Sequence, residues 1–141
     1  LNILNDNPYY KQDAPKSLGR EFFENVQHKV IDDSGLSVYD LLATATEHIA
    51  LQITNSTNHL EPSKMLITGG GAKNQYLISR IRELSKHEIV IPDTMIIDYK
   101  EALIFAFLAT LKMEGKINVL SSVTGASSDS SSGRIWMPDN L

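Results

Sequence analysis

Apolar residues in the first half of the chain recur at helical spacing. An apolar residue at about every fourth position predicts a helix over residues 17–31. A second apolar face predicts another helix from residue 37 to about residue 56, and its Ser37-x-x-Asp40 start resembles a capping box with Asp in place of Glu. Residues 5–16, which begin Asn-Asp-Asn-Pro, are predicted to form a loop before these helices.

The second half of the chain predicts alternating strands and helices. A short apolar strand is predicted over residues 65–68, a helix with one apolar stripe over 74–86, and a second strand over 88–91. This order is typical of α/β proteins with parallel strands. Two confident strands make a thin sheet for helices as apolar as these. We therefore expect this chain to be part of a longer protein.

The last predicted helix is apolar on almost every side. An Asp98-x-x-Glu101 pattern predicts its start, as in a capping box, and Gly115 predicts its end. Residues 102–109 consist of Ala, Leu, Ile and Phe alone. Such a helix is expected to be buried on more than one face.

The segment after this helix is low in complexity. Residues 121–133 contain seven serines and few side chains that can pack, which predicts a mobile loop. Weaker strands are predicted near 119–123 and 134–137. Residues 119–141 are thus expected to form a serine-rich loop and a C-terminal segment.

Composition narrows the possible classes of function. The chain has 141 residues, of which 42% are hydrophobic and 21% charged, as in a globular domain. Its net charge of −4 argues against a nucleic-acid-binding surface. Its longest apolar run is too short to cross a bilayer, so we expect no membrane segment and a cytoplasmic location. It has no cysteine, its four histidines show no metal-ligand spacing, and no metal site is expected within it.

Three consecutive glycines follow the first predicted strand. Gly69, Gly70 and Gly71 are followed by Ala72 and Asn74 at the start of an amphipathic helix. Glycine tolerates positive φ and lets a ligand lie on the backbone, and free N–H groups at a helix start favour anions. The run lacks the Gly-Lys-Ser/Thr of a Walker A loop, and Asn74 stands where Gly-x-Gly-x-x-Gly has its third glycine. A tight turn capped by Asn74 needs about one glycine, so three favour contact with a nucleotide.

Three charged side chains are further candidates. Glu101 could act on a substrate, or it could be the capping partner of Asp98. Lys16 and Arg20 could bind an anionic group, or they could be solvated charges beside an N-cap at Ser17. From the residues alone, the structural interpretation is preferred for all three.

Four segments of the chain, taken in order, resemble one known family. They are Asn7-Pro8-Tyr9-Tyr10 with Pro15 to Phe23, Leu66 to Asn74, Glu101 to Ala109, and Val123-Thr124-Gly125-Ala126. Each segment alone is weak, but the order and the coverage of nearly the whole chain are specific. The chain is similar to the 1,6-anhydro-N-acetylmuramic acid kinases, in the sugar kinase, Hsp70 and actin superfamily.

The resemblance implies a fold and a reaction. It implies that residues 1–141 are the C-terminal part of the second, ribonuclease H-like lobe of an actin-like ATPase, which closes on ATP together with a first lobe. The family's first phosphate loop and its general-base Asp would lie upstream, in the missing N-terminal part. In the family's reaction, water opens the 1,6-anhydro ring of the sugar while O6 takes the γ-phosphoryl group of ATP, usually with Mg²⁺, during recycling of cell-wall murein.

The resemblance also implies roles for residues. Glu101 is expected near the anhydro sugar, and Lys16 and Arg20 are expected to face the cleft. No catalytic residue is expected in this fragment, which should be inactive alone. The residues expected to line the adenosine and α-phosphate pocket are Gly69, Gly70, Gly71, Ala72 and Asn74.

Two other functions stay open at this point. A Rossmann-like domain that binds a dinucleotide or another adenosine cofactor would want an acidic residue after the next strand, and Asp93 could serve. A non-catalytic interaction module, such as a homodimer, is the second alternative.

Overall fold

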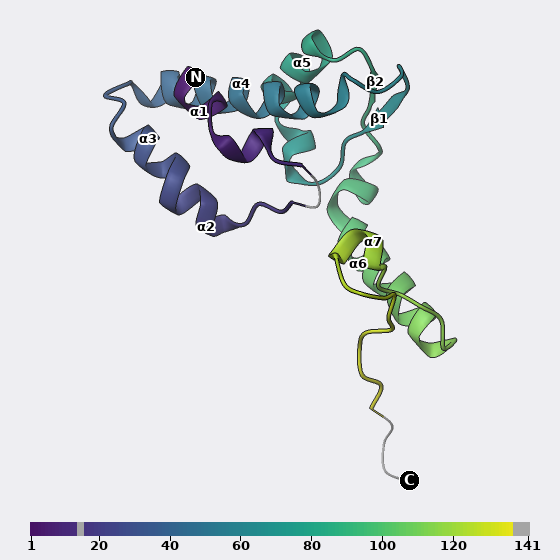
Figure 1. Cartoon of the computed structure of the whole chain (residues 1–141). Helices are drawn as coiled ribbons and strands as arrows, with labels where there is room; N and C mark the ends of the chain where they lie inside the picture. The colour runs from purple at the N-terminus through teal and green to yellow at the C-terminus, as the bar shows by residue number, and fades with distance from the viewer. Residues whose placement is uncertain (14–15, 137–141) are drawn as a thin grey trace. The chain divides into compact units, whose positions relative to one another are not determined.

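The computed structural model describes residues 1–13 and 16–136, which form two compact units (Figure 1). The first unit comprises Leu1–Ile97, and the second begins at Asp98. The described residues are mostly helical and include one two-stranded parallel sheet, so the predicted α/β class is confirmed.

The first unit opens with short helical pieces. Helix α1 (Asn2–Asn5) is followed by a 3₁₀ turn, Pro8–Lys11, where a loop was predicted. The reason is the side chain of Asn7, which accepts a hydrogen bond from the N–H of Tyr9 (2.9 Å) and so caps that turn. Pro15, part of the first resembling segment, lies outside the described residues.

The first predicted helix begins at Arg20, three residues later than expected, with Gly19 and not Ser17 at its N-cap. It consists of α2 (Arg20–Phe22), a π-helical turn (Phe23–Gln27) and α3 (His28–Asp32). The hydrogen bonds of a π-turn span one residue more than those of an α-turn. An apolar residue at every fourth position does not distinguish the two.

Helix α4 (Val38–Thr57) matches its prediction closely. The Ser37 hydroxyl accepts from the N–H of Asp40 (3.2 Å) and donates to that residue's carboxylate (2.7 Å). Ser37 is therefore an N-cap, as the sequence predicted.

The sheet and its crossover helix follow α4. Strand β1 (Lys64–Leu66) pairs in parallel with β2 (Glu88–Val90), with Lys64 opposite Glu88 and Leu66 opposite Val90. Helix α5 (Gln75–Leu84) connects them. Ala50, Leu77 and Ile81 form the buried core between α4 and α5. The sheet and α5 agree with the sequence to within two residues.

A buried polar network centred on His48 joins α4 to the N-terminal pieces. Its Nδ1 lies 2.7 Å from Oδ1 of Asn5, and its Nε2 lies 2.9 Å from the hydroxyl of Tyr10. Gln27 donates to the same hydroxyl (2.9 Å), and Gln52 donates to Oδ1 of Asn5 (2.9 Å). These bonds fasten α1, the 3₁₀ turn and the π-turn to one side of α4.

Helix α6 (Thr94–Met113) starts four residues earlier than the sequence predicted. The Asp93 carboxylate accepts from the N–H of Ile96 (3.0 Å) and acts as the cap, so Asp98 and Glu101 lie inside the helix. Its end is as predicted, because Gly115 has φ +68° and the N–H of Lys116 bonds to the carbonyl of Leu111 (2.9 Å).

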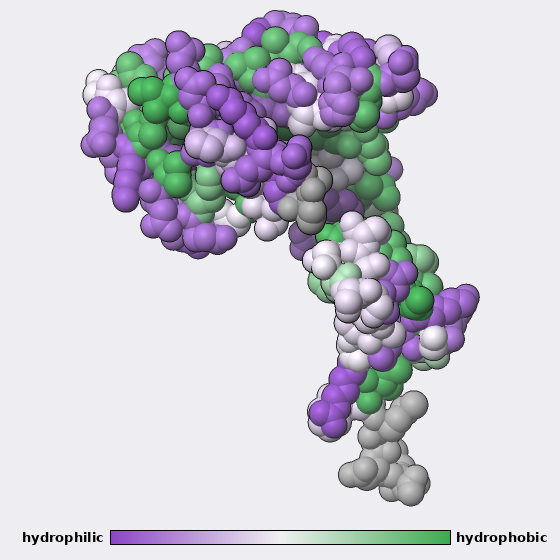
Figure 2. Space-filling model, in the orientation of Figure 1, coloured by the Kyte–Doolittle hydropathy of each residue, from purple (hydrophilic) through white to green (hydrophobic). Residues whose placement is uncertain are grey.

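The apolar side chains of α6 are exposed, contrary to the predicted burial (Figure 2). Leu103 is 60% exposed and Phe107 61%. A helix that is apolar on every side requires cover from several directions. The described residues supply too little of it.

The serine-rich segment is folded, which its composition did not predict. It contains helix α7 (Ser121–Thr124) and an antiparallel bridge between Val119 and Ser130. The Asp129 carboxylate accepts from both the N–H and the hydroxyl of Ser121 (2.7 and 2.6 Å), which holds the pKa of Asp129 below its usual value. Hydrogen bonds therefore compensate for the missing apolar side chains. Residues 134–136 form no strand.

Candidate functional site

The three glycines form the connection between β1 and α5. Past the end of β1, the N–H of Ile67 still bonds to the carbonyl of Val90 (3.0 Å), so the pairing continues toward the turn. Gly69 then adopts φ +82° and ψ −179°, a conformation reserved almost entirely for glycine. A 3₁₀ turn, Gly70–Lys73, leads to Asn74. We call residues 69–74 the glycine turn.

Two main-chain amides of the glycine turn are open. The N–H of Ala72 donates to the carbonyl of Gly69 (3.0 Å), and the N–H of Asn74 donates to that of Gly71 (3.1 Å). Gly70 and Gly71 occupy the first two positions of the 3₁₀ turn, whose N–H groups have no partner within the turn. Elsewhere in the part of the chain that the structure describes, neither amide has a recorded partner. Both can donate to a ligand.

The space above these amides is also open. A Cβ atom at Gly70 would meet no atom within 4 Å beyond its chain neighbours, and one at Gly71 would meet only Leu77 at 3.8 Å. Neither residue has positive φ. Packing within the described chain therefore does not explain why both are glycine. Glycine at both positions would permit close approach of a ligand to the backbone.

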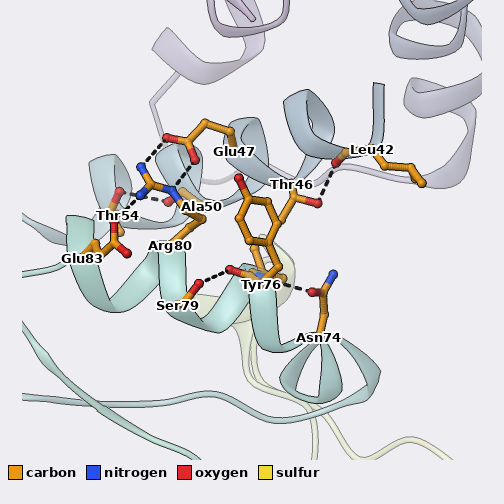
Figure 3. Close-up of polar contacts among 11 residues, drawn as sticks. Leu42, Thr46, Glu47, Ala50, Thr54, Asn74, Tyr76, Ser79, Arg80 and Glu83 are labelled. Carbon is orange, nitrogen blue, oxygen red and sulfur yellow. Dashed lines mark hydrogen bonds and ion pairs between the residues drawn. The ribbon is translucent and has the colours of Figure 1, made fainter. Parts of the chain in front are cut away.

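Asn74 joins the glycine turn to α5. Its side-chain oxygen accepts from the N–H of Leu77 (3.1 Å), so it is the predicted N-cap (Figure 3). Leu77 is buried against Ala50 of α4. The end of the turn is thus fixed to the core of the first unit.

An ion pair beside the core links α5 to α4 (Figure 3). Nε of Arg80 lies 2.6 Å from Oε2 of Glu47, and its Nη2 lies 2.9 Å from Oε1 of the same carboxylate. Arg80 also pairs with Glu83. Hydrogen bonds from Arg80 hold the pKa of Glu47 below its usual value. Arg80 lies outside the apolar stripe predicted for residues 74–86, and nothing in its spacing indicated a partner on another helix.

The network around His48 was missed for a different reason. Burial lowers the pKa of His48, which is 4% exposed. His48 and Gln52 lie four residues apart next to the apolar face of α4. Two polar residues at this helical spacing, next to core positions, could have indicated a buried polar network.

The charged candidates make local contacts in the structure. Lys16 donates to the carbonyls of Tyr9, Tyr10 and Gln12 (3.3, 3.4 and 2.9 Å), at the end of the 3₁₀ turn Pro8–Lys11. Arg20 pairs with Glu24 one helical turn away (2.6 Å). Both side chains lie in the first unit, as does the glycine turn.

Glu101 lies in the second unit, on an exposed part of α6. Because α6 begins at Thr94, Glu101 is not the capping partner that the pattern suggested. The structure thus places one group of candidates in a single continuous turn: Gly69, Gly70, Gly71, Ala72 and Asn74. The contacts given above for Lys16 and Arg20 are with residues outside that turn. Glu101 belongs to the other unit.

Two searches of the described residues add further findings. No three His, Asp or Glu side chains within residues 1–13 and 16–136 gather in a way that could hold a metal ion. Over the same ranges, each helix is too short or too polar to cross a bilayer.

The chain is similar to curated proteins that share one name. A family model described as anhydro-N-acetylmuramic acid kinase matches residues 1–138. An anhydro-N-acetylmuramic acid kinase of Actinobacillus pleuropneumoniae serotype 3 is 38% identical, and the match covers 96% of this chain and 39% of that relative. Proteins of the same name from Rhodococcus erythropolis and Sulfurovum are 36% and 32% identical, over 89% and 97% of this chain and 33% and 39% of theirs. The chain spans about two fifths of the length of the relatives it matches.

Proposed function

This chain belongs to the anhydro-N-acetylmuramic acid kinase family, and from that premise we propose that its glycine turn binds the adenosine end of ATP. The observation that carries the proposal is the pair of open amides at Gly70 and Gly71, with free space where side chains would stand. N–H groups of this kind favour the negative charge of a phosphate. Ala72 and Asn74 would line the same nucleotide site.

We propose that the whole protein phosphorylates an anhydro amino sugar. Water opens the 1,6-anhydro ring, O6 accepts the γ-phosphoryl group of ATP, and the product is N-acetylmuramic acid 6-phosphate in murein recycling. Such a transfer depends on positioning and charge neutralisation. Mg²⁺ would accompany the nucleotide. The described residues assemble no set of protein ligands for it, so we assign none.

Within that enzyme, the chain would form the C-terminal part of the second, ribonuclease H-like lobe, in the cytoplasm. The general base and the first phosphate loop would come from the part that the relatives have in addition. Glu101 would lie near the sugar, and Lys16 and Arg20 would face the cleft. Without the general base, this fragment is expected to show no turnover.

A nucleotide titration tests the glycine turn. In Gly70→Val, the added Cβ meets no atom within 4 Å beyond its chain neighbours, and the side chain would occupy the space beside the open amides. We expect at least a tenfold weaker Kd for Mg-ATP, about 1.4 kcal/mol or more, measured by calorimetry. Ala43→Val, at an exposed position of α4, is the control and should bind as the parent does.

Two outcomes would contradict this proposal. One is an unchanged Kd for Gly70→Val. The other is thermal stabilisation by NAD equal to that by ATP, which would favour a general adenosine-cofactor site. No stabilisation by either nucleotide, with a dimer in light scattering, would favour the interaction module.

A further inference from the structure

We propose that Glu47 and Arg80 are positioning residues for the glycine turn. Their ion pair would fix how α5 lies on α4, and hence where the amides of Gly70 and Gly71 point. This inference rests on the proposed nucleotide role of that turn. It concerns two helices whose paired residues are 33 positions apart in the sequence.

The glycine turn has two hydrogen bonds of its own but almost no side-chain packing at Gly70 and Gly71. Gly70 and Gly71 have no side chains, and the space around them is open. Glycine loses more conformational freedom on ordering than any other residue. The turn is continuous with β1 at one end and, at the other end, with Asn74, whose side chain caps α5. Any rotation or sliding of α5 would carry the turn with it.

The apolar contact beneath α5 does not fix that position by itself. Leu77 and Ile81 pack on Ala50 of α4. Burial of apolar surface is non-directional, and a residue as small as Ala50 offers little relief to resist sliding. The core, extended by the partly buried Ile53 and Leu84, holds α5 against α4. At the end of α5 far from the glycine turn, the side chain of Asn58 also donates to the carbonyl of Leu84 (2.9 Å).

The ion pair adds a directional contact that lies closer along α5 to the glycine turn than the contact of Asn58 does. A guanidinium with two nitrogens on one carboxylate fixes both distance and orientation. The side chains of Arg80 and Glu47 are only 26% and 22% exposed, so solvent screens the pair less than a surface pair. Arg80 lies six residues after Asn74, close enough for a shift of its contact to move the turn. Figure 3 shows Arg80 of α5 reaching Glu47 of α4, with Asn74 at the start of α5.

Helix α4 is itself held by a second set of contacts. His48, the neighbour of Glu47 in sequence, is bonded to Asn5 and Tyr10. Helix α4 therefore contacts the N-terminal pieces through His48 and contacts α5 through Glu47. Glu47 can position α5 only if α4 is itself held in place, and the contacts of His48 hold it.

Nucleotide affinity at matched stability tests the proposal. Arg80→Met keeps an unbranched stem of similar bulk to the aliphatic part of Arg80 and removes the guanidinium, while Ile81→Val loosens the same helix contact without touching the pair. At a temperature where all variants are folded, we expect Kd for Mg-ATP to rise at least fivefold in Arg80→Met and less than twofold in Ile81→Val. Equal losses in the two variants would show a purely structural role and overturn the proposal.

A second variant shows whether the two residues act together. Glu47→Gln should raise Kd by a similar factor, and the double variant Glu47→Gln/Arg80→Met should be no worse than Arg80→Met alone. Additive losses would mean that the residues act independently, and they would overturn the pairing. Because Glu47→Gln is nearly isosteric, it also covers the case in which Arg80→Met fails to fold.

Backbone mobility separates this proposal from the nucleotide site itself. Heteronuclear NOE values of the Gly70 and Gly71 amides, measured without nucleotide, should fall in Arg80→Met and stay at the parent value in Ile81→Val. If Gly70→Val binds ATP as the parent does, the nucleotide site is wrong, and the NOE values alone decide whether the pair orders the turn. Unchanged values in Arg80→Met would overturn the positioning role whatever the titrations show.

Discussion

Gly69 differs from its two neighbours in what its backbone requires. At φ +82° and ψ −179°, a side chain would be strained even though the space around it is open. We expect Gly69→Ala to lower the free energy of unfolding by about 1–3 kcal/mol. Gly70→Ala, where φ is not positive, should leave it nearly unchanged. Urea unfolding of both variants measures the difference, and equal effects would show that the described turn geometry is wrong.

His48 should make the stability of the chain depend on pH. Oδ1 of Asn5 is an acceptor, so Nδ1 carries the proton and Nε2 accepts from Tyr10. Protonation would set an N–H at Nε2 against the amide group of Gln27, 3.3 Å away. Burial lowers the pKa of His48 below its model-peptide value of 6.5, so the folded state binds fewer protons than the unfolded state. The stabilisation is therefore complete above about pH 6.5 and is lost as the pH falls through the lowered value.

Unfolding midpoints measured between pH 7.5 and pH 5 should show this loss. His48→Gln should remove most of the pH dependence, and at pH 7.5 it should cost about 1–3 kcal/mol because Asn5 and Tyr10 lose a buried partner. His59→Gln, at an exposed position, is the control. A parent-like pH dependence in His48→Gln would assign the effect to other groups.

At the level of elements, the cap of α5 matters because this helix carries the glycine turn. Asn74→Ala removes the acceptor for the N–H of Leu77 and should destabilise the chain by about 1 kcal/mol. Asn74→Ser restores a good capping side chain and should recover most of that loss. Thermal unfolding followed by circular dichroism measures both. A serine variant as unstable as the alanine variant would argue against the cap.

The helix starts show which elements a sequence can predict. Ser37 and Asn74 were identified as caps because each polar residue directly precedes a clear apolar face. Asp98 was misassigned because the same short pattern also occurs inside helices, and Asp93 offers a competing cap. The order of the elements predicted the parallel pairing of the strands. The three consecutive glycines between a strand and a helix predicted the glycine turn. The Glu47–Arg80 and His48 contacts join distant positions, which local patterns in one sequence do not specify.

For the whole molecule, the exposed apolar helix is the most consequential departure from expectation. The predicted burial of α6 requires cover that the described residues do not supply, and the chain spans about two fifths of its relatives' length. We expect the isolated chain to bind the dye ANS strongly. Leu103→Glu and Phe107→Glu should weaken that fluorescence while changing the free energy of unfolding by no more than about 0.5 kcal/mol. Val38→Glu, on α4, is the control, and an equal decrease there would disprove a localised apolar surface.

The two hydrogen bonds between Ser121 and Asp129 have a practical consequence for protein engineering. They close the base of the loop, while residues 125–128 at the tip are exposed. The entropy of closing a loop rises only slowly with its length, so additional residues at the tip add little strain to a closed base. A peptide epitope or a fluorophore-accepting sequence inserted between Ala126 and Ser127 should therefore leave the secondary structure intact. That position would provide a reporter handle on the second unit, well separated in sequence from the glycine turn.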